Sequence, residues 1–404
     1  MSIMIVKRKL FSEVEKYLED KQAIVVTGMR RVGKTTLLTY FFDKIASQNK
    51  IYLDLEDPLN RAIFDSENYE EIKAELTRRG LDFSGKAYVF LDEIQYASNI
   101  PSVVKYLYDH YSVKFLLTGS ASFYLKNLFS ESLAGRKVVF EMFPLDFEEF
   151  LQFKNVSYTP PAFAETVSQT THLFFSPFVS EYLRWGGMPQ VVLQTDVEKK
   201  EAILRDIFSS FFQKEVQVLG DFSKNSTVRS LILLLSRRVG QKVDLSRISQ
   251  EIGVSRQTLY DYLEFLSGTY FVSLLPALGR DDVAVRKQRK LYFEDVGLFS
   301  ILDEPPFGSR FENSVLLNLR GGGEMYYWQS KTQEIDFVVK GMRGEINAFE
   351  VKETATNSDI KKLSKVADKL GLKNYHLLSH NFVPDKMVKY LFQLPDFCKP
   401  AAGR

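Results

Sequence analysis

The chain has 404 residues, more than one hydrophobic core usually serves, so at the ordinary size of roughly 100 to 200 residues per domain we expect several domains. Its 45% apolar and 14% aromatic residues exclude a disordered chain, and its single cysteine, Cys398, excludes an internal disulfide framework. The 53 Lys and Arg residues nearly balance the 51 Asp and Glu residues, so net charge gives no support for nucleic-acid binding.

The N-terminus carries charge before any signal-peptide core could form. No apolar stretch approaches the roughly 20 residues of a membrane span. A lone thiol also suits a reducing cytosol. We therefore expect a soluble, cytoplasmic protein with no membrane partner.

A glycine-rich loop follows a helical pattern over 7–20 and an apolar strand pattern over 23–26. It fits G-x-x-x-x-G-K-[ST] and precedes an apolar helix; its residues are Gly28, Met29, Arg30, Arg31, Val32, Gly33, Lys34, Thr35 and Thr36. The glycines let backbone N–H groups curl round a nucleotide's phosphates, Lys34 reaches the β/γ oxygens, and the Thr35 hydroxyl ligates Mg²⁺. The alternative is an ordinary glycine turn, which the flanking strand and helix disfavour.

Three further strands of a parallel sheet are expected over 51–57, 87–93 and 114–120. The second ends in Asp92 and Glu93, a Walker B pattern in which Asp92 holds the magnesium shell and Glu93 polarises the attacking water. The alternative to a Walker B motif is an ordinary strand that happens to end in two acidic residues. The third ends in Thr118 and Ser120, which either sense the γ-phosphate or form a plain strand-ending turn.

These motifs, with Leu133-Ala134-Gly135-Arg136 and the run 143–150, resemble a widespread prokaryotic family of AAA-type ATPases with a C-terminal DUF4143 region. The similarity runs nearly end to end. The resemblance implies that the nucleotide is ATP, and it makes Arg136 a candidate arginine finger for the transition-state charge. A structural salt bridge is the alternative role for Arg136. A homo-oligomer would let Arg136 act in a neighbour's site, although it could also act within its own chain.

Loop-forming residues over 151–165 predict a boundary or hinge between domains. The residues Gly186-Gly187-Met188-Pro189 predict a turn with no evident chemistry.

From about 226 the spacing predicts a winged helix-turn-helix, with Ser255 capping the third helix. In a DNA reader that helix would present Arg256, Gln257 and Tyr260 to base edges. However, Asp261 and Glu264 on the same helix repel phosphate, and such domains also serve as protein-packing modules. The run Arg286-Lys287-Gln288-Arg289-Lys290 is the best local basic patch or a solvated linker face.

The C-terminal strand patterns resemble the PD-(D/E)xK nuclease core. Strand alternation places Glu350 and Lys352 on one face. The resemblance implies that Asp336 and Glu350 hold Mg²⁺ and that Lys352 orients the water or stabilises the phosphate, with Glu312 as an extra ligand. Ile335 stands where the pattern has proline. A structural salt bridge in a non-cutting relic would use the same residues.

The sequence thus predicts an α/β protein with four parts. They are an AAA-type P-loop ATPase domain with a parallel sheet (1–155), a helical linker or lid (156–225), a winged helix-turn-helix (226–280) and a restriction-endonuclease-like α/β domain (281–404). We expect an ATPase that uses ATP and Mg²⁺ and couples hydrolysis to binding or processing of double-stranded DNA. The alternative is a signalling or defence switch that binds a protein partner through an inert nuclease-like domain.

Overall fold

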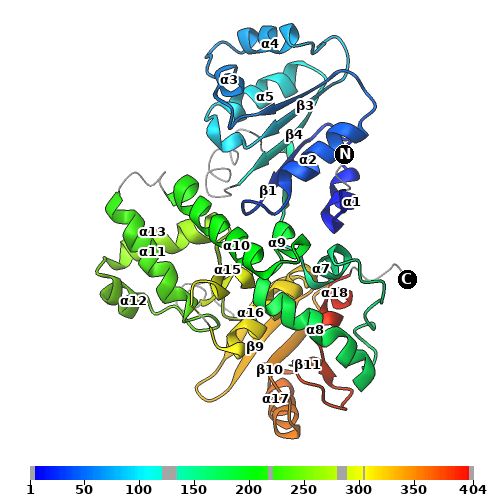
Figure 1. The fold of residues 1–404 in the computed structure, drawn as a ribbon, viewed down its shortest axis with the longest axis vertical. Coiled ribbons are helices and arrows are strands. Elements are labelled where there is room, and N and C mark those ends of the chain that lie inside the picture. Colours follow the sequence, from blue (N-terminus) through cyan, green and yellow to red (C-terminus); the bar gives the residue numbers. More distant parts are fainter. Residues whose placement is uncertain are drawn as a thin grey trace. The chain divides into compact units, whose positions relative to one another are not determined.

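The computed structural model describes residues 5–120, 133, 135–216, 222–279, 289–303 and 305–399, without the side chains of 222–225. It divides into two compact units (Figure 1). The first comprises Met1–Phe143 with Gly268–Tyr270, and the second comprises Pro144–Ser267 with Phe271–Arg404. Within these described ranges, no helix is long and apolar enough to cross a bilayer.

The first unit is built on a five-stranded parallel sheet in the order β2-β3-β4-β1-β5. Its strands are β1 (Ala23–Thr27), β2 (Lys50–Asp54), β3 (Ala87–Asp92), β4 (Val113–Gly119) and β5 (Lys137–Glu141). Its helices are α1 (Lys9–Glu15), α2 (Lys34–Lys44), α3 (Pro58–Ala62), α4 (Tyr69–Arg78) and α5 (Ile100–His110), with a 3₁₀ turn η1 (Ile94–Tyr96). Because β1, β3 and β4 are buried along their whole length, their sequences are mostly apolar and do not alternate, although β4 also buries Lys114 and Thr118.

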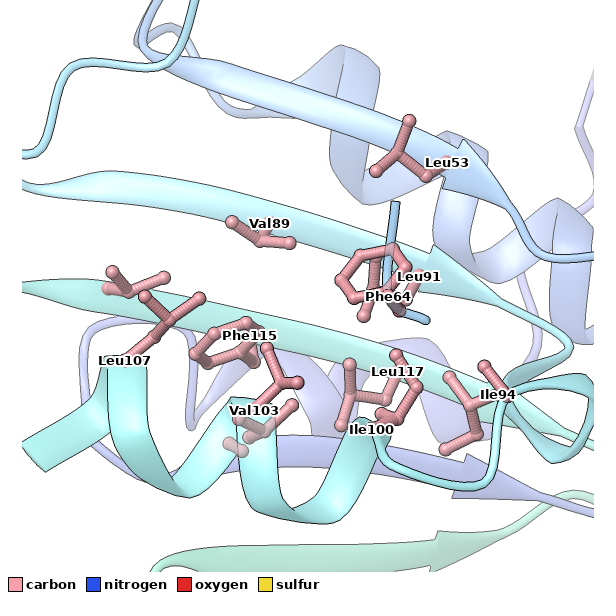
Figure 2. Close-up of a cluster of buried hydrophobic side chains, with 14 of the residues drawn as sticks. Leu53, Phe64, Val89, Leu91, Ile94, Ile100, Val103, Leu107, Phe115 and Leu117 are labelled. Atoms are coloured by element: carbon pink, nitrogen blue, oxygen red, sulfur yellow. The ribbon is translucent and has the colours of Figure 1, made fainter. Parts of the chain in front are cut away.

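One face of this sheet packs on α5 (Figure 2). Val89 and Leu91 are two residues apart on β3, so their side chains share that face, and Phe115 and Leu117 on β4 do the same. Side chains one helical turn apart on α5 cover them, including Val103 and Leu107. The resulting core holds the carboxyl ends of β1, β3 and β4 in register, where the predicted nucleotide residues lie.

The second unit begins with helices. They are α7 (Phe147–Phe153), α8 (Gln169–Trp185), α9 (Pro189–Leu193), α10 (Val197–Phe211) with a π-helical turn η2 (Phe212–Val216), α11 (Phe222–Ser236), α12 (Leu245–Ile252) and α13 (Arg256–Gly268). A two-stranded antiparallel sheet follows, formed by β6 (Val272–Leu275) and β7 (Lys290–Phe293). The Ser255 hydroxyl accepts from the Thr258 N–H at 3.0 Å, so the expected cap of α13 is present.

The unit ends in a mixed sheet in the order β12-β11-β10-β9-β8. Its strands are β8 (Glu324–Gln329), β9 (Glu334–Lys340), β10 (Ile346–Lys352), β11 (Asn374–Ser379) and β12 (Val388–Lys389). Pairing is antiparallel from β8 to β10 and parallel from β10 to β12. The helical elements are α15 (Val296–Ser300), α16 (Phe307–Leu319), η4 (Arg320–Gly322), α17 (Asn357–Leu370), η5 (Leu391–Gln393) and α18 (Leu394–Phe397).

The glycine pair at 186–187 closes around a buried carboxylate in this unit. The Gly187 N–H donates to Asp295 Oδ2 at 2.7 Å, and a Cβ on Gly186, whose φ is +73°, would lie 2.2 Å from Asp295 Oδ1. A Cβ on Gly187 would lie 2.3 Å from the Leu145 carbonyl oxygen. The Gly186–Gly187 turn is therefore so closely packed that no larger residue fits at either position.

The predicted fold class is confirmed, because an α/β unit with a parallel sheet is followed by a helical region and a second, mixed sheet. The division at 155, 225 and 280 stays a prediction. Residues 286–288 of the predicted basic patch lie outside the described residues.

Candidate functional site

The phosphate-loop residues connect the carboxyl end of β1 to the first turn of α2. Lys34 is the first residue of α2 and is buried, and its Nζ donates to the carbonyl oxygens of Gly28 and Met29, both at 2.8 Å. Thr35 and Thr36 are exposed in the first turn, while Met29 and Val32 are buried. The loop is thus anchored by its apolar residues and leaves the hydroxyls of the first helical turn accessible.

The two glycines of the loop adopt conformations that other residues avoid. Gly28 has φ +148° and Gly33 has φ +105°. A Cβ on Gly28 would lie 2.0 Å from the Met142 carbonyl oxygen, which is far inside van der Waals contact. Arg31 also has a positive φ, +64°, so the backbone of the loop curls as a phosphate cradle requires.

Asp92 ends β3 beside this loop and is 2% exposed. Its Oδ1 accepts hydrogen bonds from the Thr118 hydroxyl and from the Glu93 N–H, and its Oδ2 accepts from the Tyr52 hydroxyl at 2.8 Å. Burial and the neighbouring Asp92 carboxylate raise the pKa of Tyr52, so this phenol keeps its proton and acts as a donor. Thr118 and Tyr52 therefore orient the carboxylate predicted to hold magnesium.

Glu93 lies next to Asp92 in a left-handed conformation, with φ 54° and ψ 50°. Its Oε2 accepts from the Gln95 amide and from the Ser120 hydroxyl at 3.1 Å. Burial alone would raise the pKa of Glu93, but the charges of Lys34 and Arg30 and these two hydrogen bonds hold it below its usual value. Glu93 is therefore held as a carboxylate, the form that a general base requires.

The sequence reasoning missed Tyr52 and Gln95. Tyr52 lies on β2, whose register pairs Leu53 with Leu91 and Asp54 with Asp92, so only the sheet order places it beside β3. Gln95 follows Glu93 by two residues, and that proximity was the available signal. Arg30 is likewise oriented by a neighbour, since it donates to the Tyr96 hydroxyl at 2.9 Å.

Magnesium and a nucleotide fit this set of groups. Hydroxyl and carboxylate oxygens at Thr35 and Asp92 are the hard ligands that Mg²⁺ prefers. Lys34 and the loop N–H groups suit phosphate oxygens.

Arg136 lies away from these groups. It precedes β5, and its carbonyl oxygen accepts from the N–H of Ala23, the first residue of β1. The phosphate loop follows the other end of β1, about 13 Å further at roughly 3.3 Å per strand residue. The Arg136 guanidinium instead pairs with Asp109 at 2.9 and 3.2 Å. The structural salt bridge, which was the alternative role of Arg136, is therefore present. The structure does not support Arg136 as an arginine finger in this chain's own site.

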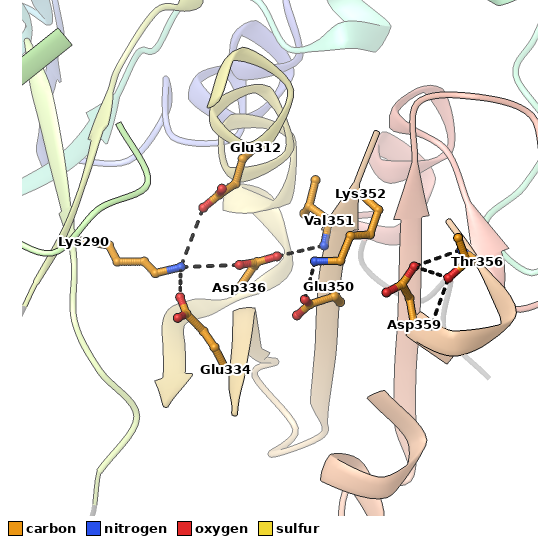
Figure 3. A network of polar contacts seen from close by, with 9 residues as sticks. All are labelled: Lys290, Glu312, Glu334, Asp336, Glu350, Val351, Lys352, Thr356 and Asp359. Atoms are coloured by element: carbon orange, nitrogen blue, oxygen red, sulfur yellow. Dashed lines mark hydrogen bonds and ion pairs between the residues drawn. The ribbon is translucent and has the colours of Figure 1, made fainter. Parts of the chain in front are cut away.

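In the second unit, three carboxylates from α16 and β9 surround the ammonium of Lys290 (Figure 3). Lys290 Nζ lies 3.7 Å from Glu312 Oε1 and 3.4 Å from Asp336 Oδ1, and it also pairs with Glu334. Asp336 Oδ2 accepts from the Val351 N–H of β10 at 2.9 Å. The structure thus brings Asp336 and Glu312 together around the Lys290 ammonium, which also pairs with Glu334.

Glu350 and Lys352 share one face of β10, as strand alternation predicts, and Lys352 Nζ donates to Glu350 Oε1 at 2.7 Å. Burial and the Asp336 charge raise the pKa of Glu350 to about 7. Burial and Asp336 likewise raise the pKa of Glu312 to about 7. Among the residues that the structure describes, no three His, Cys, Asp or Glu side chains are arranged to hold a metal ion.

The face of α13 predicted to read DNA is occupied by local contacts. Gln257 donates to Asp261 at 2.9 Å, and the Tyr260 hydroxyl donates to Glu264 at 2.8 Å. Two of the three side chains nominated for base edges are thus paired with the acids that repel phosphate.

Family models match three consecutive parts of the chain. Residues 20–151 match an AAA domain, 177–306 match a domain of unknown function, DUF8612, and 307–389 match another, DUF4143. The expected resemblance is confirmed, because an AAA domain model and the DUF4143 model both match the chain. The nuclease-like assignment has no such support.

Two relatives align with most of this chain. An uncharacterized protein of Methanocaldococcus jannaschii is 27% identical over 90% of this chain and 83% of its own length. One from Haemophilus influenzae is also 27% identical, over 88% of this chain and 90% of its own length.

Solved structures resemble the chain more weakly. A Walker-type ATPase of Pyrococcus abyssi is 17% identical, with TM-score 0.48 over 74% of this chain and 96% of that one. The Orc1 protein of Aeropyrum pernix, solved in complex with DNA, is 14% identical, with TM-score 0.34 over 76% and 94%. At these scores neither likeness bears on function.

Proposed function

We propose that this protein hydrolyses ATP. The observation that carries the proposal is the Glu93 carboxylate, which is held ionised by Lys34, Arg30, Gln95 and Ser120 beside a phosphate loop. A site that only bound nucleotide would have no need of an ionised, oriented carboxylate at this position. The AAA domain match over residues 20–151 supports ATP as the nucleotide.

In this proposal the loop from Gly28 to Thr36 binds the phosphates through its N–H groups, and Lys34 leaves the Gly28 and Met29 carbonyl oxygens to reach the β/γ oxygens. Mg²⁺ held by Thr35 and Asp92 would offset phosphate charge when bound. Glu93 accepts the proton of the attacking water. Ser120 and Gln95 position Glu93, and Thr118 and Tyr52 position Asp92.

We propose Arg136 as an arginine finger only for the site of a neighbouring copy. Its place beside the start of β1 and its pairing with Asp109 keep it from its own phosphate loop. This role requires a homo-oligomer with ATP bound.

The direct test is ATP turnover by the purified chain and by Glu93→Gln, which preserves shape but removes the base. We expect a loss of about 100-fold or more in kcat with nucleotide binding retained. Equal turnover by both proteins would refute the hydrolytic role of Glu93.

For the work coupled to hydrolysis, we propose binding or processing of double-stranded DNA through the winged-helix and nuclease-like regions. Helices α11, α12 and α13 followed by the β6–β7 sheet support the winged-helix interpretation. A second role is a nucleotide switch that binds a protein partner. The contacts of Gln257 with Asp261 and of Tyr260 with Glu264 favour this second role.

DNA binding at two salt concentrations separates the two roles. A steep salt slope that Arg256→Ala weakens, while Arg205→Ala does not, would support the DNA role. Arg205 is a suitable control because it is an exposed arginine paired with an acid four residues away on α10. Absence of salt-dependent binding, with ATPase activity unchanged by DNA, would support the switch.

A further inference from the structure

Lys290 is the first residue of β7, and its side chain is only 4% exposed. Its ammonium makes ion pairs with Glu312, Glu334 and Asp336 (Figure 3). An ammonium therefore lies where the three carboxylates converge.

Three carboxylate oxygens of the cluster also have other protein donors. Asp336 Oδ2 accepts from the Val351 N–H at 2.9 Å, and Glu312 Oε1 accepts from the Tyr292 hydroxyl at 2.7 Å. Glu350 Oε1 accepts from Lys352 at 2.7 Å. The oxygens that face Lys290 and Val351 are therefore paired, whereas Glu350 Oε2 is buried and has no hydrogen-bond partner among the described residues.

A magnesium ion does not fit this arrangement. Mg²⁺ needs oxygen ligands at about 2.0–2.1 Å in near-octahedral geometry. Asp336, Glu312 and Glu334 would have to supply them at the position that Lys290 Nζ occupies. An ion held between Asp336 and Glu350 would lie beside the same buried ammonium, which would repel it. Lys290 and the metal therefore exclude each other.

We propose that the Lys290 ammonium takes the place of a divalent cation in this cluster, so that the nuclease-like site of this protein holds no Mg²⁺. The carboxylates of Glu312, Glu334 and Asp336 then fasten β7 to α16 and β9 rather than serving hydrolysis. The C-terminal region would then bind or pack against a partner and would not cleave nucleic acid.

The test uses the full-length chain without nucleotide and Mn²⁺ alone as the probe, counted by its electron paramagnetic resonance signal. Wild type and Asp336→Asn should bind the same number of Mn²⁺ ions. Lys290→Ala should gain one Mn²⁺, because the three carboxylates, which are not arranged to hold a metal ion in the structure, lose their cation and can draw together on one. Adding Asp336→Asn to Lys290→Ala should abolish that gain.

Thermal melting supplies an independent readout. Mn²⁺ should raise the melting temperature of Lys290→Ala by at least about 3 °C and leave wild type unshifted, since a ligand that binds only the folded state stabilises it. Lys200→Ala is the matched control. Lys200 is also 4% exposed in the second unit, but its partner Glu181 keeps a second lysine, Lys154, at 2.9 Å. This control should gain neither Mn²⁺ nor stability.

Two results would overturn the proposal. One is a Mn²⁺ ion bound by wild type and lost in Asp336→Asn; the other is a folded Lys290→Ala that gains no Mn²⁺. If Lys290→Ala does not fold under any condition, the comparison of wild type with Asp336→Asn decides alone. Because no nucleotide is present, neither result bears on ATP hydrolysis.

Discussion

The Nζ of Lys34 donates to the carbonyl oxygen of Gly28, its own loop's first glycine, at 2.8 Å. The lysine predicted to bind phosphate is thus buried against the backbone that is predicted to surround the phosphate. Replacing these carbonyl contacts by phosphate oxygens keeps the ammonium paired in both states. This exchange makes the lysine a direct test of the nucleotide site.

We expect Lys34→Ala to abolish ATP turnover, with a loss of about 100-fold or more in kcat, because a cation facing the transferred phosphoryl group is removed. The measurement is phosphate release at saturating ATP. Lys86→Ala is the control, since Lys86 pairs with Glu19 in the same unit and should turn over ATP normally. Unchanged ATP turnover in Lys34→Ala would contradict the proposal that this protein hydrolyses ATP.

Ser120→Ala should move the acidic limb of the kcat–pH profile to higher pH. The Ser120 hydroxyl is one of the groups that hold the pKa of Glu93 below its usual value, so its removal lets that pKa rise. Glu93 acts as a base only above its pKa, and activity should therefore appear at higher pH in the variant. A profile that superimposes on that of wild type would show that Ser120 does not tune Glu93.

Gly28→Ala should cost far more than Gly80→Ala. Both glycines have positive φ, +148° and +99°, so both alanine variants carry backbone strain of about 1 kcal/mol or more. Only Gly28 also faces backbone, at 2.0 Å from the Met142 carbonyl oxygen, whereas Gly80 has open space. We expect nucleotide binding to be lost in Gly28→Ala and retained in Gly80→Ala, as measured by fluorescent nucleotide titration. Equal affinities would show that the loop tolerates a side chain at Gly28.

Arg136→Ala should leave the turnover of dilute, monomeric protein unchanged. In its own chain the guanidinium pairs with Asp109 beside the start of β1, away from the phosphate loop. Asp109→Ala removes the same ion pair and serves as the control. A loss in Arg136→Ala that grows with protein concentration would support a finger acting between copies, and a loss that persists at dilution would contradict the placement.

The unfolding free energy of wild type, measured relative to Asp295→Asn, should fall as pH rises. Burial raises the pKa of Asp295 to about 6, from 3.8 in the unfolded chain. The folded state therefore holds this proton more tightly, and the stability it contributes below pH 3.8 is lost as pH rises through 6. The loss between pH 5 and pH 7 should be about 1 kcal/mol, read from urea unfolding. A pH-independent difference would mean that Asp295 titrates normally.

Local sequence was sufficient for β1, β2, β3, β4 and α2 of the first unit, whereas α3, α4, α5 and β5 were not predicted. The runs before Lys34 and Asp92 are apolar along their whole length because β1 and β3 are buried on both faces of a parallel sheet, and such strands are legible without tertiary information. The glycine spacing of the loop is equally local, since it follows from backbone conformations that only a few residues make. The alternation of Glu350 and Lys352 on β10 was predicted for the same reason.

The sequence by itself determined an AAA-type chain with a phosphate loop, an acidic strand end and an alternating E-x-K strand, because each is encoded within a few consecutive residues. Only the tertiary structure decided which neighbours those residues meet. Tyr52 reaches Asp92 through the strand order, Arg136 lies at the opposite end of β1 from the loop, and Lys290 enters an acidic cluster formed by α16 and β9. The physical reason is that ion pairs and hydrogen bonds depend on distance in space, and these partners are between 22 and 113 positions apart along the chain, from Lys290 to Glu312 and from Arg136 to Ala23.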